Sequence, residues 1–290
     1  MSAHILDGRA VATSIKQSIK HDVAQYTHNF GRAPGLAVIL VGADPASRVY
    51  VANKIKACHE VGINSYNYEL DAKLTQLELI AKIEELNNRN DIDGILVQLP
   101  LPKHINENAV ITSIDPAKDV DGFHQYNFGK LAQGNPNLRP CTPFGVIQLL
   151  EHYRISVAGK NAVVVGASNI VGRPMAFELL QKKATVSVCH RATTNLAHYV
   201  SHADIVVVAT GNYNAVKAEW LKKHQVIVDV GIHRGADGLL HGDVDFNKAK
   251  DRVAWITPVP GGVGPMTICT LLQNTLQAAK QKEQKMFCYN

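Results

Sequence analysis

The sequence lacks long apolar runs, clustered charge and paired cysteines. In its 290 residues no apolar stretch reaches the roughly 18 residues that a membrane helix needs, and Met1–Arg9 lacks the apolar core of a signal peptide. The 30 basic and 25 acidic residues give a net charge of +5. The basic residues form no run of about five, so nucleic-acid binding is weakly supported and an anionic small molecule explains the excess equally well. Five widely spaced cysteines in no metal-ligand pattern are typical of reduced thiols. We therefore expect a cytoplasmic protein that uses no metal, membrane or nucleic acid.

What the chain does contain is a repeated alternation of short apolar runs and helical patterns. Its 46% hydrophobic and 19% charged residues are typical of a globular protein, and 290 residues favour two domains of about 150. The alternation predicts parallel sheets with helices on both faces. The predicted strands are Leu36–Val41, Gly94–Gln98, Asn161–Val165, Thr185–Cys189, Ile205–Ala209 and Val226–Val230. The predicted helices are Pro45–Val61, Gln76–Asn87, Val171–Lys182 and Asn195–His202. A domain boundary is expected in Gly129–Pro143, where glycine and prolines interrupt the pattern.

A glycine-containing turn follows the strand at Asn161–Val165 and precedes a helix, which is the order of a dinucleotide site. Gly166 permits the turn, Ser168 can offer a hydroxyl and a backbone N–H to a phosphate, and Gly172 allows close packing of helix on strand. The run departs from Gly-x-Gly-x-x-Gly, because Ser168 replaces the second glycine and the last glycine comes one residue late. A turn of this kind that binds no ligand is the alternative.

The following strand indicates which dinucleotide would bind. It ends in Cys189-His190-Arg191 with no acidic residue in reach, whereas an acid at this place binds the ribose of NAD. An arginine suits the 2′-phosphate of NADP, so the sequence favours NADP with Arg191 as a ligand. Arg191 as a solvated charge at a strand end is the alternative. Ile232 follows the strand Val226–Val230 at the edge where ligands bind in open sheets, unless it is a core residue.

Polar and aromatic residues share one face of the first predicted helix. Asp44 is a good N-cap and the helix predicted over Pro45–Val61 begins with a proline, as helices often do. Tyr50 and Lys54 are four residues apart and therefore neighbours, with Ser47 one turn earlier. This spacing places a flat aromatic ring beside a long amine. A solvated helix face is the alternative for the lysine.

Two further polar residues follow the strand at Gly94–Gln98. The strand runs into two prolines and leaves Gln98 at its end, either as a loop amide or as a ligand to a polar ring. Further on, Asp119 and Asp121 precede Gly122, where an Asp-Gly turn is the alternative to a binding role for Asp121. A calcium loop is not indicated, because the glutamate and the spacing of an EF-hand are missing.

The run from Pro258 to Thr267 is uncharged and contains three prolines and three glycines. Such a run cannot propagate a helix or lie inside a central strand. It can bring bare backbone close to a ligand, because glycine has no Cβ and proline fixes the path of the chain. An ordinary surface turn is the alternative.

Taken together, seven ordered segments resemble the bifunctional methylenetetrahydrofolate dehydrogenase/methenyltetrahydrofolate cyclohydrolase family over almost the whole chain. The segments are Ala33–Gly42, Ser47-x-x-Tyr-x-x-x-Lys54, Gly94–Pro102, Lys118–Phe123, Arg139–Pro143, Gly166–Pro174 and Pro258–Thr267. The resemblance implies oxidation of 5,10-methylenetetrahydrofolate with NADP to the 5,10-methenyl compound and its hydrolysis to 10-formyltetrahydrofolate. It also implies a homodimer that acts in one-carbon metabolism and purine biosynthesis.

The resemblance assigns roles to residues of this chain. Lys54 corresponds to the catalytic lysine, Tyr50 to the stacking tyrosine, Gln98 to the glutamine that tunes the lysine, and Asp121 to the pterin-binding aspartate. The implied substrate-binding residues are Ser47, Tyr50, Asp121, Pro260, Gly261 and Gly262, and the implied cofactor-binding residues are Gly166, Ala167, Ser168, Arg191 and Ile232. Hydride loss needs orientation more than a base, whereas hydrolysis needs proton transfer. Lysine is a poor base at neutral pH, so Lys54 would have to be desolvated or hydrogen-bonded.

The expected fold is two α/β domains with parallel sheets around a cleft. Residues 1–140 would carry the chemistry, residues 141–290 would form a Rossmann-like NADP-binding domain, and the helix at Thr267–Lys280 would pack back on the first domain. The chain departs from the family's pattern at Thr210-Gly-Asn-Tyr, which lacks a common proline, and at Phe144, where a basic residue is common. A monofunctional NAD(P)-dependent dehydrogenase of the same fold and an idle dinucleotide-sensing protein are the alternatives, and retention of Lys54 and Gln98 argues against both.

Overall fold

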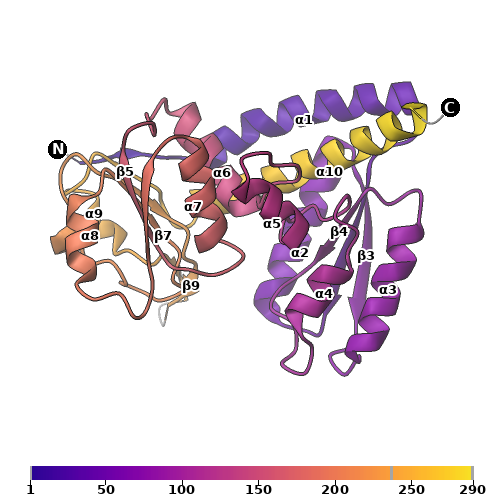
Figure 1. The fold of residues 1–290 in the computed structure, drawn as a ribbon, viewed down its shortest axis with the longest axis horizontal. Helices are drawn as coiled ribbons and strands as arrows, with labels where there is room; N and C mark the ends of the chain where they lie inside the picture. Colours follow the sequence, from indigo (N-terminus) through magenta and orange to yellow (C-terminus); the bar gives the residue numbers. More distant parts are fainter. Residues whose placement is uncertain (1, 236–237, 289–290) are drawn as a thin grey trace. The chain divides into compact units, whose positions relative to one another are not determined.

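The computed structural model describes residues 2–235 and 238–288, which form two compact units (Figure 1). Unit 1 comprises Met1–Thr13 and Pro140–Thr267, and unit 2 comprises Ser14–Arg139 and Ile268–Asn290. The chain passes between the units within helix α1 (Gly8–Phe30), ahead of α6 (Cys141–His152) and within α10 (Val263–Cys288). This division differs from the two consecutive domains expected from the sequence. Both units are built from parallel strands and helices, so the predicted α/β fold class is confirmed.

Unit 1 contains a six-stranded parallel sheet. Its strands, in spatial order, are β1 (His4–Ile5), β11 (Trp255–Ile256), β8 (Val226–Asp229), β7 (Ile205–Val208), β5 (Asn161–Val165) and β6 (Thr185–Cys189). The other elements are α7 (Gly172–Gln181), α8 (Leu196–His202), the 3₁₀ turn η1 (Ala218–Trp220), the antiparallel pair β9 (His233–Arg234) and β10 (Leu240–His241), and α9 (Phe246–Ala249). The central strands are buried because helices cover both faces, which explains their continuous Val and Ile runs. All carboxyl ends of the strands meet at one edge.

Unit 2 has a smaller parallel sheet in the order β3 (Asn64–Leu70), β2 (Gly35–Val41) and β4 (Gly94–Val97). Its remaining helices are α2 (Pro45–Val61), α3 (Gln76–Asn88), α4 (Glu107–Ser113) and α5 (Gln125–Ala132), with most of α1 and α10. The central strand β2 is buried along its whole length. The core between the sheet and α3 includes Ile39, Leu79 and Ile95.

Helix α2 has the bounds that its end signals predict. The Asp44 carboxylate accepts a hydrogen bond of 2.7 Å from the Ser47 N–H, and Gly62 ends the helix in the left-handed conformation with φ of 87°. Helix α1 and strand β3 do not appear among the predicted elements. Helix α10 extends beyond its predicted range Thr267–Lys280 at both ends.

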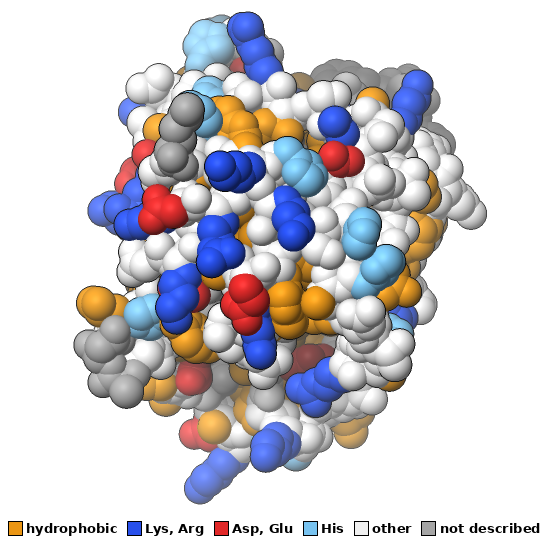
Figure 2. All heavy atoms as spheres, turned by 90° about the vertical axis from the view of Figure 1, so that its left-hand side faces the viewer, with side chains coloured by type: hydrophobic (Ala, Val, Ile, Leu, Met, Phe, Trp, Pro, Cys, Tyr) orange, Lys and Arg blue, Asp and Glu red, His pale blue; other side chains and the backbone are white. Residues whose placement is uncertain are grey.

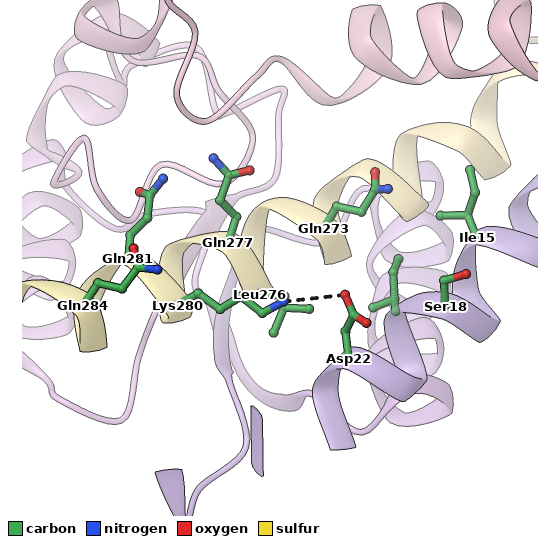
Figure 3. Close-up of a pocket in the computed structure, with 10 residues that line it drawn as sticks. Ile15, Ser18, Asp22, Gln273, Leu276, Gln277, Lys280, Gln281 and Gln284 are labelled. Atoms are coloured by element: carbon green, nitrogen blue, oxygen red, sulfur yellow. Dashed lines mark ion pairs between the residues drawn. The ribbon is translucent and has the colours of Figure 1, made fainter. Parts of the chain in front are cut away.

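Helices α1 and α10 pack along each other in unit 2 and leave an open groove of about 650 Å³ (Figure 3). Lys280 Nζ lies 3.5 Å from Asp22 Oδ2 at this groove. Glu283 accepts hydrogen bonds from the Tyr26 hydroxyl at 3.0 Å and from Arg32 Nη2 at 2.7 Å. These contacts hold the second half of α10 against α1, so the end of the chain contributes to the packing of unit 2.

None of the helices in residues 2–235 and 238–288 is long and apolar enough to cross a membrane. Within the same residues, no group of three or more His, Cys, Asp or Glu side chains could hold a metal ion. On the face of unit 1 shown in Figure 2, Lys and Arg side chains are dispersed among neutral and apolar surface rather than gathered in one patch.

Candidate active site

The side chain of Lys54 is turned into unit 2 and bonded to the end of strand β4. Lys54 is only 9% exposed, and its Nζ donates a hydrogen bond of 3.1 Å to Gln98 Oε1. Gln98 follows β4 directly, its N–H binds the carbonyl oxygen of Ile39 at 2.9 Å, and its Nε2 binds the carbonyl oxygen of Leu99 at 2.7 Å. Both the backbone and the amide of Gln98 are therefore fixed. The burial of Lys54 argues against the solvated-face alternative. Its contact with Gln98 agrees with the pairing that the resemblance implies, and the roles of both residues stay a prediction.

Tyr50 lies one turn before Lys54 on the same face of α2. It is 38% exposed, and partial burial raises the pKa of its hydroxyl. Ser47, one turn earlier, is buried with only 4% exposure. Of these three residues Tyr50 presents the most surface, which is what a ring that stacks on a planar ligand requires.

Asp121 lies in a turn that directly follows a segment bridged to β4. The Ile95 N–H donates to the carbonyl oxygen of Lys118 at 2.8 Å, and Ile95 and Asp119 form a parallel bridge. The chain then turns, with the Gly122 N–H bound to the carbonyl oxygen of Asp119 at 3.1 Å, and Asp121 is half-buried within this turn. The following Gly122 has φ of 75°, as an Asp-Gly turn needs. The turn and a binding role are therefore compatible.

Two buried polar residues that the sequence reasoning did not select hold this turn in place. Asp119 is 1% exposed and accepts hydrogen bonds from His124 N–H at 2.8 Å, Phe123 N–H at 3.2 Å and Asn127 Nδ2 at 2.9 Å. Burial raises the pKa of the Asp119 carboxyl. From α10, Asn274 Nδ2 donates to the carbonyl oxygen of Val120 at 2.8 Å. A polar residue inside the apolar pattern of α10 was the available signal for Asn274.

The turn after β5 in unit 1 has the close packing that its glycines predicted. Gly166 has φ of 124°, and a Cβ there would lie 2.1 Å from the carbonyl oxygen of Ala209. A Cβ on Gly172 would lie 2.1 Å from the carbonyl oxygen of Gly166. Ser168 Oγ accepts the N–H groups of Val171 at 3.2 Å and Gly172 at 3.3 Å, at the start of α7. The hydroxyl therefore shapes the turn, and its hydrogen remains available to an oxygen acceptor.

Arg191 and Ile232 lie at the carboxyl edge of the same sheet. The Gly166 N–H donates to the carbonyl oxygen of Cys189 at 2.9 Å, which brings the end of β6 beside the turn after β5. Arg191, two residues further, is exposed. Ile232 is 38% exposed, so the alternative that it is a core residue does not hold.

The glycines of the run 258–262 approach backbone of their own unit. A Cβ on Gly8 would lie 1.7 Å from the carbonyl oxygen of Gly262, and the Arg9 N–H donates to the carbonyl oxygen of Gly261 at 3.1 Å. Gly261 has φ of 113° and both glycines are buried, whereas Pro260 is exposed. In the structure these glycines therefore approach the first turn of α1, and the approach to a ligand stays a prediction.

Two family models match the chain. The model described as "Tetrahydrofolate dehydrogenase/cyclohydrolase, catalytic domain" matches residues 6–121, and that described as "Tetrahydrofolate dehydrogenase/cyclohydrolase, NAD(P)-binding domain" matches residues 140–283. A bifunctional protein FolD of Legionella pneumophila (strain Corby) is 57% identical over 279 residues, which are 96% of this chain and 98% of that protein.

Solved structures show the same relationship. The bifunctional enzyme FolD (methylenetetrahydrofolate dehydrogenase/cyclohydrolase) of Campylobacter jejuni is 49% identical with a TM-score of 0.94, covering 97% of this chain and 100% of its own. The Trypanosoma brucei N5,N10-methylenetetrahydrofolate dehydrogenase-cyclohydrolase, solved with NADP cofactor and inhibitor, is 39% identical with a TM-score of 0.94 and covers 98% and 99%. Because both family models and these near full-length similarities agree with the motifs of both units, the chain belongs to the tetrahydrofolate dehydrogenase/cyclohydrolase family.

Proposed function

We propose that this protein is bifunctional: it oxidises 5,10-methylenetetrahydrofolate with NADP to 5,10-methenyltetrahydrofolate and hydrolyses that product to 10-formyltetrahydrofolate. The observation that carries the hydrolytic half is the hydrogen bond of 3.1 Å between Lys54 Nζ and Gln98 Oε1 on a lysine that is 9% exposed. A structural helix lysine is more often solvated, and a monofunctional dehydrogenase has no need of this pair. Membership of the family supports both halves.

In the hydrolytic step, water attacks the methenyl carbon and one folate nitrogen must then leave, so protons have to move. Lys54 Nζ is the group that would exchange them, because Gln98 fixes its position and burial keeps bulk water from it. Tyr50 would stack on the pterin with its exposed ring. Asp121 would accept hydrogen bonds from the amino-pyrimidine edge, which is rich in donors. Ser47, in the first turn of α2, would help to bind the folate. Because its side chain is buried, it would act through the position of its backbone more than through exposed surface.

The residues at the carboxyl edge of unit 1 fit a phosphorylated dinucleotide. Gly166, Ala167 and Ser168 form a turn at the start of α7, where N–H groups and the helix dipole favour phosphate. Arg191 is exposed beside this turn and would bind the 2′-phosphate, and Ile232 would support the flat end of the molecule with its exposed side chain. When bound, NADP accepts the hydride that the methylene carbon loses.

The run at Pro260, Gly261 and Gly262 would act as an uncharged wall beside the pterin. Pro260 is exposed, whereas the two glycines are buried against the start of α1. This arrangement supports a division of roles in which the glycines fix the path of the backbone and Pro260 presents the surface.

A spectroscopic assay that follows methenyl-folate formation with NADP or NAD, and then its decay without cofactor, tests both activities. Lys54→Met should abolish hydrolysis while NADP still binds with unchanged affinity. Lys56→Met, an exposed lysine of the same helix, is the matched control and should keep both activities. Hydrolysis at the wild-type rate in Lys54→Met would refute the role of the lysine. If the wild type forms methenyl-folate but does not hydrolyse it, the protein is a monofunctional dehydrogenase.

Substitution of Asp121 tests the folate site separately. Asp121→Ala should raise KM for both folate substrates about tenfold, because one hydrogen-bonded charged acceptor is lost. Asp115→Ala, an exposed aspartate of the preceding segment, is the control. An unaltered folate KM in Asp121→Ala would mean that the residue serves only the turn.

We further propose that the protein acts as a homodimer in the cytoplasm and supplies one-carbon units to purine biosynthesis. These assignments follow from what the resemblance of the sequence implies. The cysteines of the described side chains, Cys58, Cys141, Cys189 and Cys269, are buried and form no disulfide bond, in keeping with a reducing compartment. Light scattering on the purified protein tests the dimer, and a mass of one chain at micromolar concentration would exclude it. Fractionation of the native cells tests the cytoplasmic location. Purine dependence of a deletion strain tests the role in purine biosynthesis.

A further inference from the structure

One buried carboxylate joins two exposed loops at the carboxyl edge of unit 1. The Asp243 side chain is fully buried, and its Oδ2 accepts hydrogen bonds from Thr210 N–H at 2.6 Å, Thr210 Oγ1 at 2.8 Å and Gly211 N–H at 3.1 Å. Its other oxygen, Oδ1, is 2.6 Å from His233 Nε2. Thr210 and Gly211 lie just beyond β7, and His233 begins β9 after a short connection from β8. The carboxylate therefore bonds the segments that follow two neighbouring strands.

The backbone of Asp243 holds the far end of the first loop as well. Its carbonyl oxygen accepts the Ala215 N–H at 2.9 Å, and Val216 and Val244 form a parallel bridge. Residues between these anchors, including Tyr213, are exposed. This is the segment that lacks the proline common in the family. Asp243 therefore anchors both ends of the loop, and hydrogen bonds between Asn212 and Thr210 add support within it.

A second aspartate fixes Asp243 itself. Asp229 accepts the N–H groups of Asp243 at 2.9 Å and Val244 at 2.8 Å. The packing is close: a Cβ on Gly231 would lie 2.0 Å from Asp243 Oδ1, and a Cβ on Gly242 would lie 2.0 Å from Asp229 Oδ2. Neither carboxylate can move without displacing backbone, so the position of the two loops is set rigidly.

The strand order indicates which part of a dinucleotide these loops would meet. The phosphate turn follows β5 and Arg191 follows β6, while β7 and β8 lie on the opposite side of β5 in the order β8-β7-β5-β6. A dinucleotide whose phosphates lie at the turn after β5 and whose 2′-phosphate lies at β6 extends its nicotinamide riboside towards β7 and β8. The loops that Asp243 fixes are at that end.

We propose that Asp243 and His233 are positioning residues for the nicotinamide half of NADP, acting through the loops at 210–214 and 231–233. The inference rests on the proposed NADP site. His233 donates its Nε2 hydrogen to the carboxylate, which fixes the residue beside Ile232, and Thr210 provides the matching anchor of the other loop. Neither Asp243 nor His233 needs to touch the cofactor.

Calorimetric titration with NADP and with adenosine 2′,5′-bisphosphate, which has no nicotinamide half, tests the proposal. His233→Ala should weaken NADP binding about tenfold by loss of a charge-assisted hydrogen bond, and leave the affinity for the bisphosphate within about twofold. His233→Gln, which restores a donor at the same reach, should regain most of the loss. Thr210→Val should weaken NADP binding in the same way as His233→Ala. Thr210→Ser, which keeps the hydroxyl, should retain most of the affinity. Asp245→Asn, which affects the cap of α9 in the same segment, is the control.

Kinetics provides a second readout that a merely structural role would not reproduce. In His233→Ala the dehydrogenase KM for NADP should rise with kcat changed less, while cofactor-free hydrolysis of methenyl-folate stays at the wild-type rate. Equal losses for NADP and the bisphosphate, no loss of either, or a parallel fall in hydrolysis would each overturn the proposal. A wild-type protein that binds NADP but does not oxidise methylene-folate would refute the proposed function while leaving the titrations decisive for His233.

Discussion

Replacing Gln98 by leucine removes the acceptor that Lys54 Nζ has in the structure while nearly conserving side-chain volume. The lysine is 9% exposed, so water cannot fully replace the lost oxygen. A hydrogen bond to a charged group is worth about 1.5–3 kcal/mol, and each 1.36 kcal/mol is tenfold in rate. If Gln98 orients the lysine for proton transfer, the kcat of methenyl-folate hydrolysis should fall about 10- to 100-fold in Gln98→Leu. Oxidation of methylene-folate should fall less, because hydride loss depends on orientation of the substrate rather than on a base.

The decay of methenyl-folate without NADP measures the hydrolytic step alone, and urea unfolding measures the structural cost of the same substitution. The free energy of unfolding should be about 2 kcal/mol lower in Gln98→Leu than in the wild type, and a protein of ordinary stability tolerates this loss. Gln98→Asn, whose amide is one methylene shorter, should behave like the leucine variant. Gln25→Leu on the exposed face of α1 is the control for a glutamine lost elsewhere in unit 2. Hydrolysis at the wild-type rate in Gln98→Leu would refute the reasoning, because the contact would then serve only the loop.

Three further substitutions test other parts of the structure. Arg191→Ala should reduce the preference for NADP over NAD about tenfold or more, measured as the ratio of kcat/KM values, and an unchanged ratio would remove Arg191 from the site. Gly8→Ala forces a Cβ to within 1.7 Å of a backbone oxygen and should lower the free energy of unfolding by about 3 kcal/mol, whereas Gly129→Ala, with open space in α5, should leave it unchanged or raise it. Burial lowers the pKa of Lys118 to about 8 from its ordinary 10.5, so the unfolded chain holds this proton to higher pH than the folded protein. The stability of the wild type relative to Lys118→Met should therefore rise between those pH values in urea unfolding, and a flat difference would contradict the shift.

Most of the strands that the sequence predicted are buried along their length. Strand β5 has its predicted bounds, and β7 and β8 end one residue earlier than expected, because a strand covered on two sides is apolar at nearly every position. Strand β6 also has its predicted bounds, although it is a partly exposed edge strand. Strand β3 was not predicted because it lacks a continuous apolar run. It lies at the edge of its sheet, and its sequence Asn64-Ser-Tyr-Asn-Tyr-Glu-Leu70 mixes polar and aromatic residues that stay partly exposed. Helix α1 could have been found from Val11, Ile15, Ile19 and Val23, which recur every four residues.

The discontinuous units could not be predicted from local pattern. Residues 1–13 belong to unit 1 because β1, only two residues long, pairs with β11, and no periodicity is readable in His4–Ile5. The seam after Arg139 was visible because prolines and glycine interrupt the pattern there. Which side each terminus joins depends on contacts more than 240 residues apart in the chain, such as the pairing of Ile5 with Ile256.

The candidate site shows a similar division between residues proposed to bind ligands and residues that bind backbone. Lys54, Tyr50 and Gln98 could be selected as candidates because helical spacing and a strand end are local features, and the resemblance then assigned their roles. Asp119 and Asp243 have no such signature, since a carboxylate that accepts backbone N–H groups can serve any loop of any protein. Their importance becomes visible only when the loops they hold are known to carry Asp121 or to flank Ile232. Substituting such a carboxylate should therefore alter the affinity for one ligand through the loop it holds, even though the carboxylate never touches that ligand.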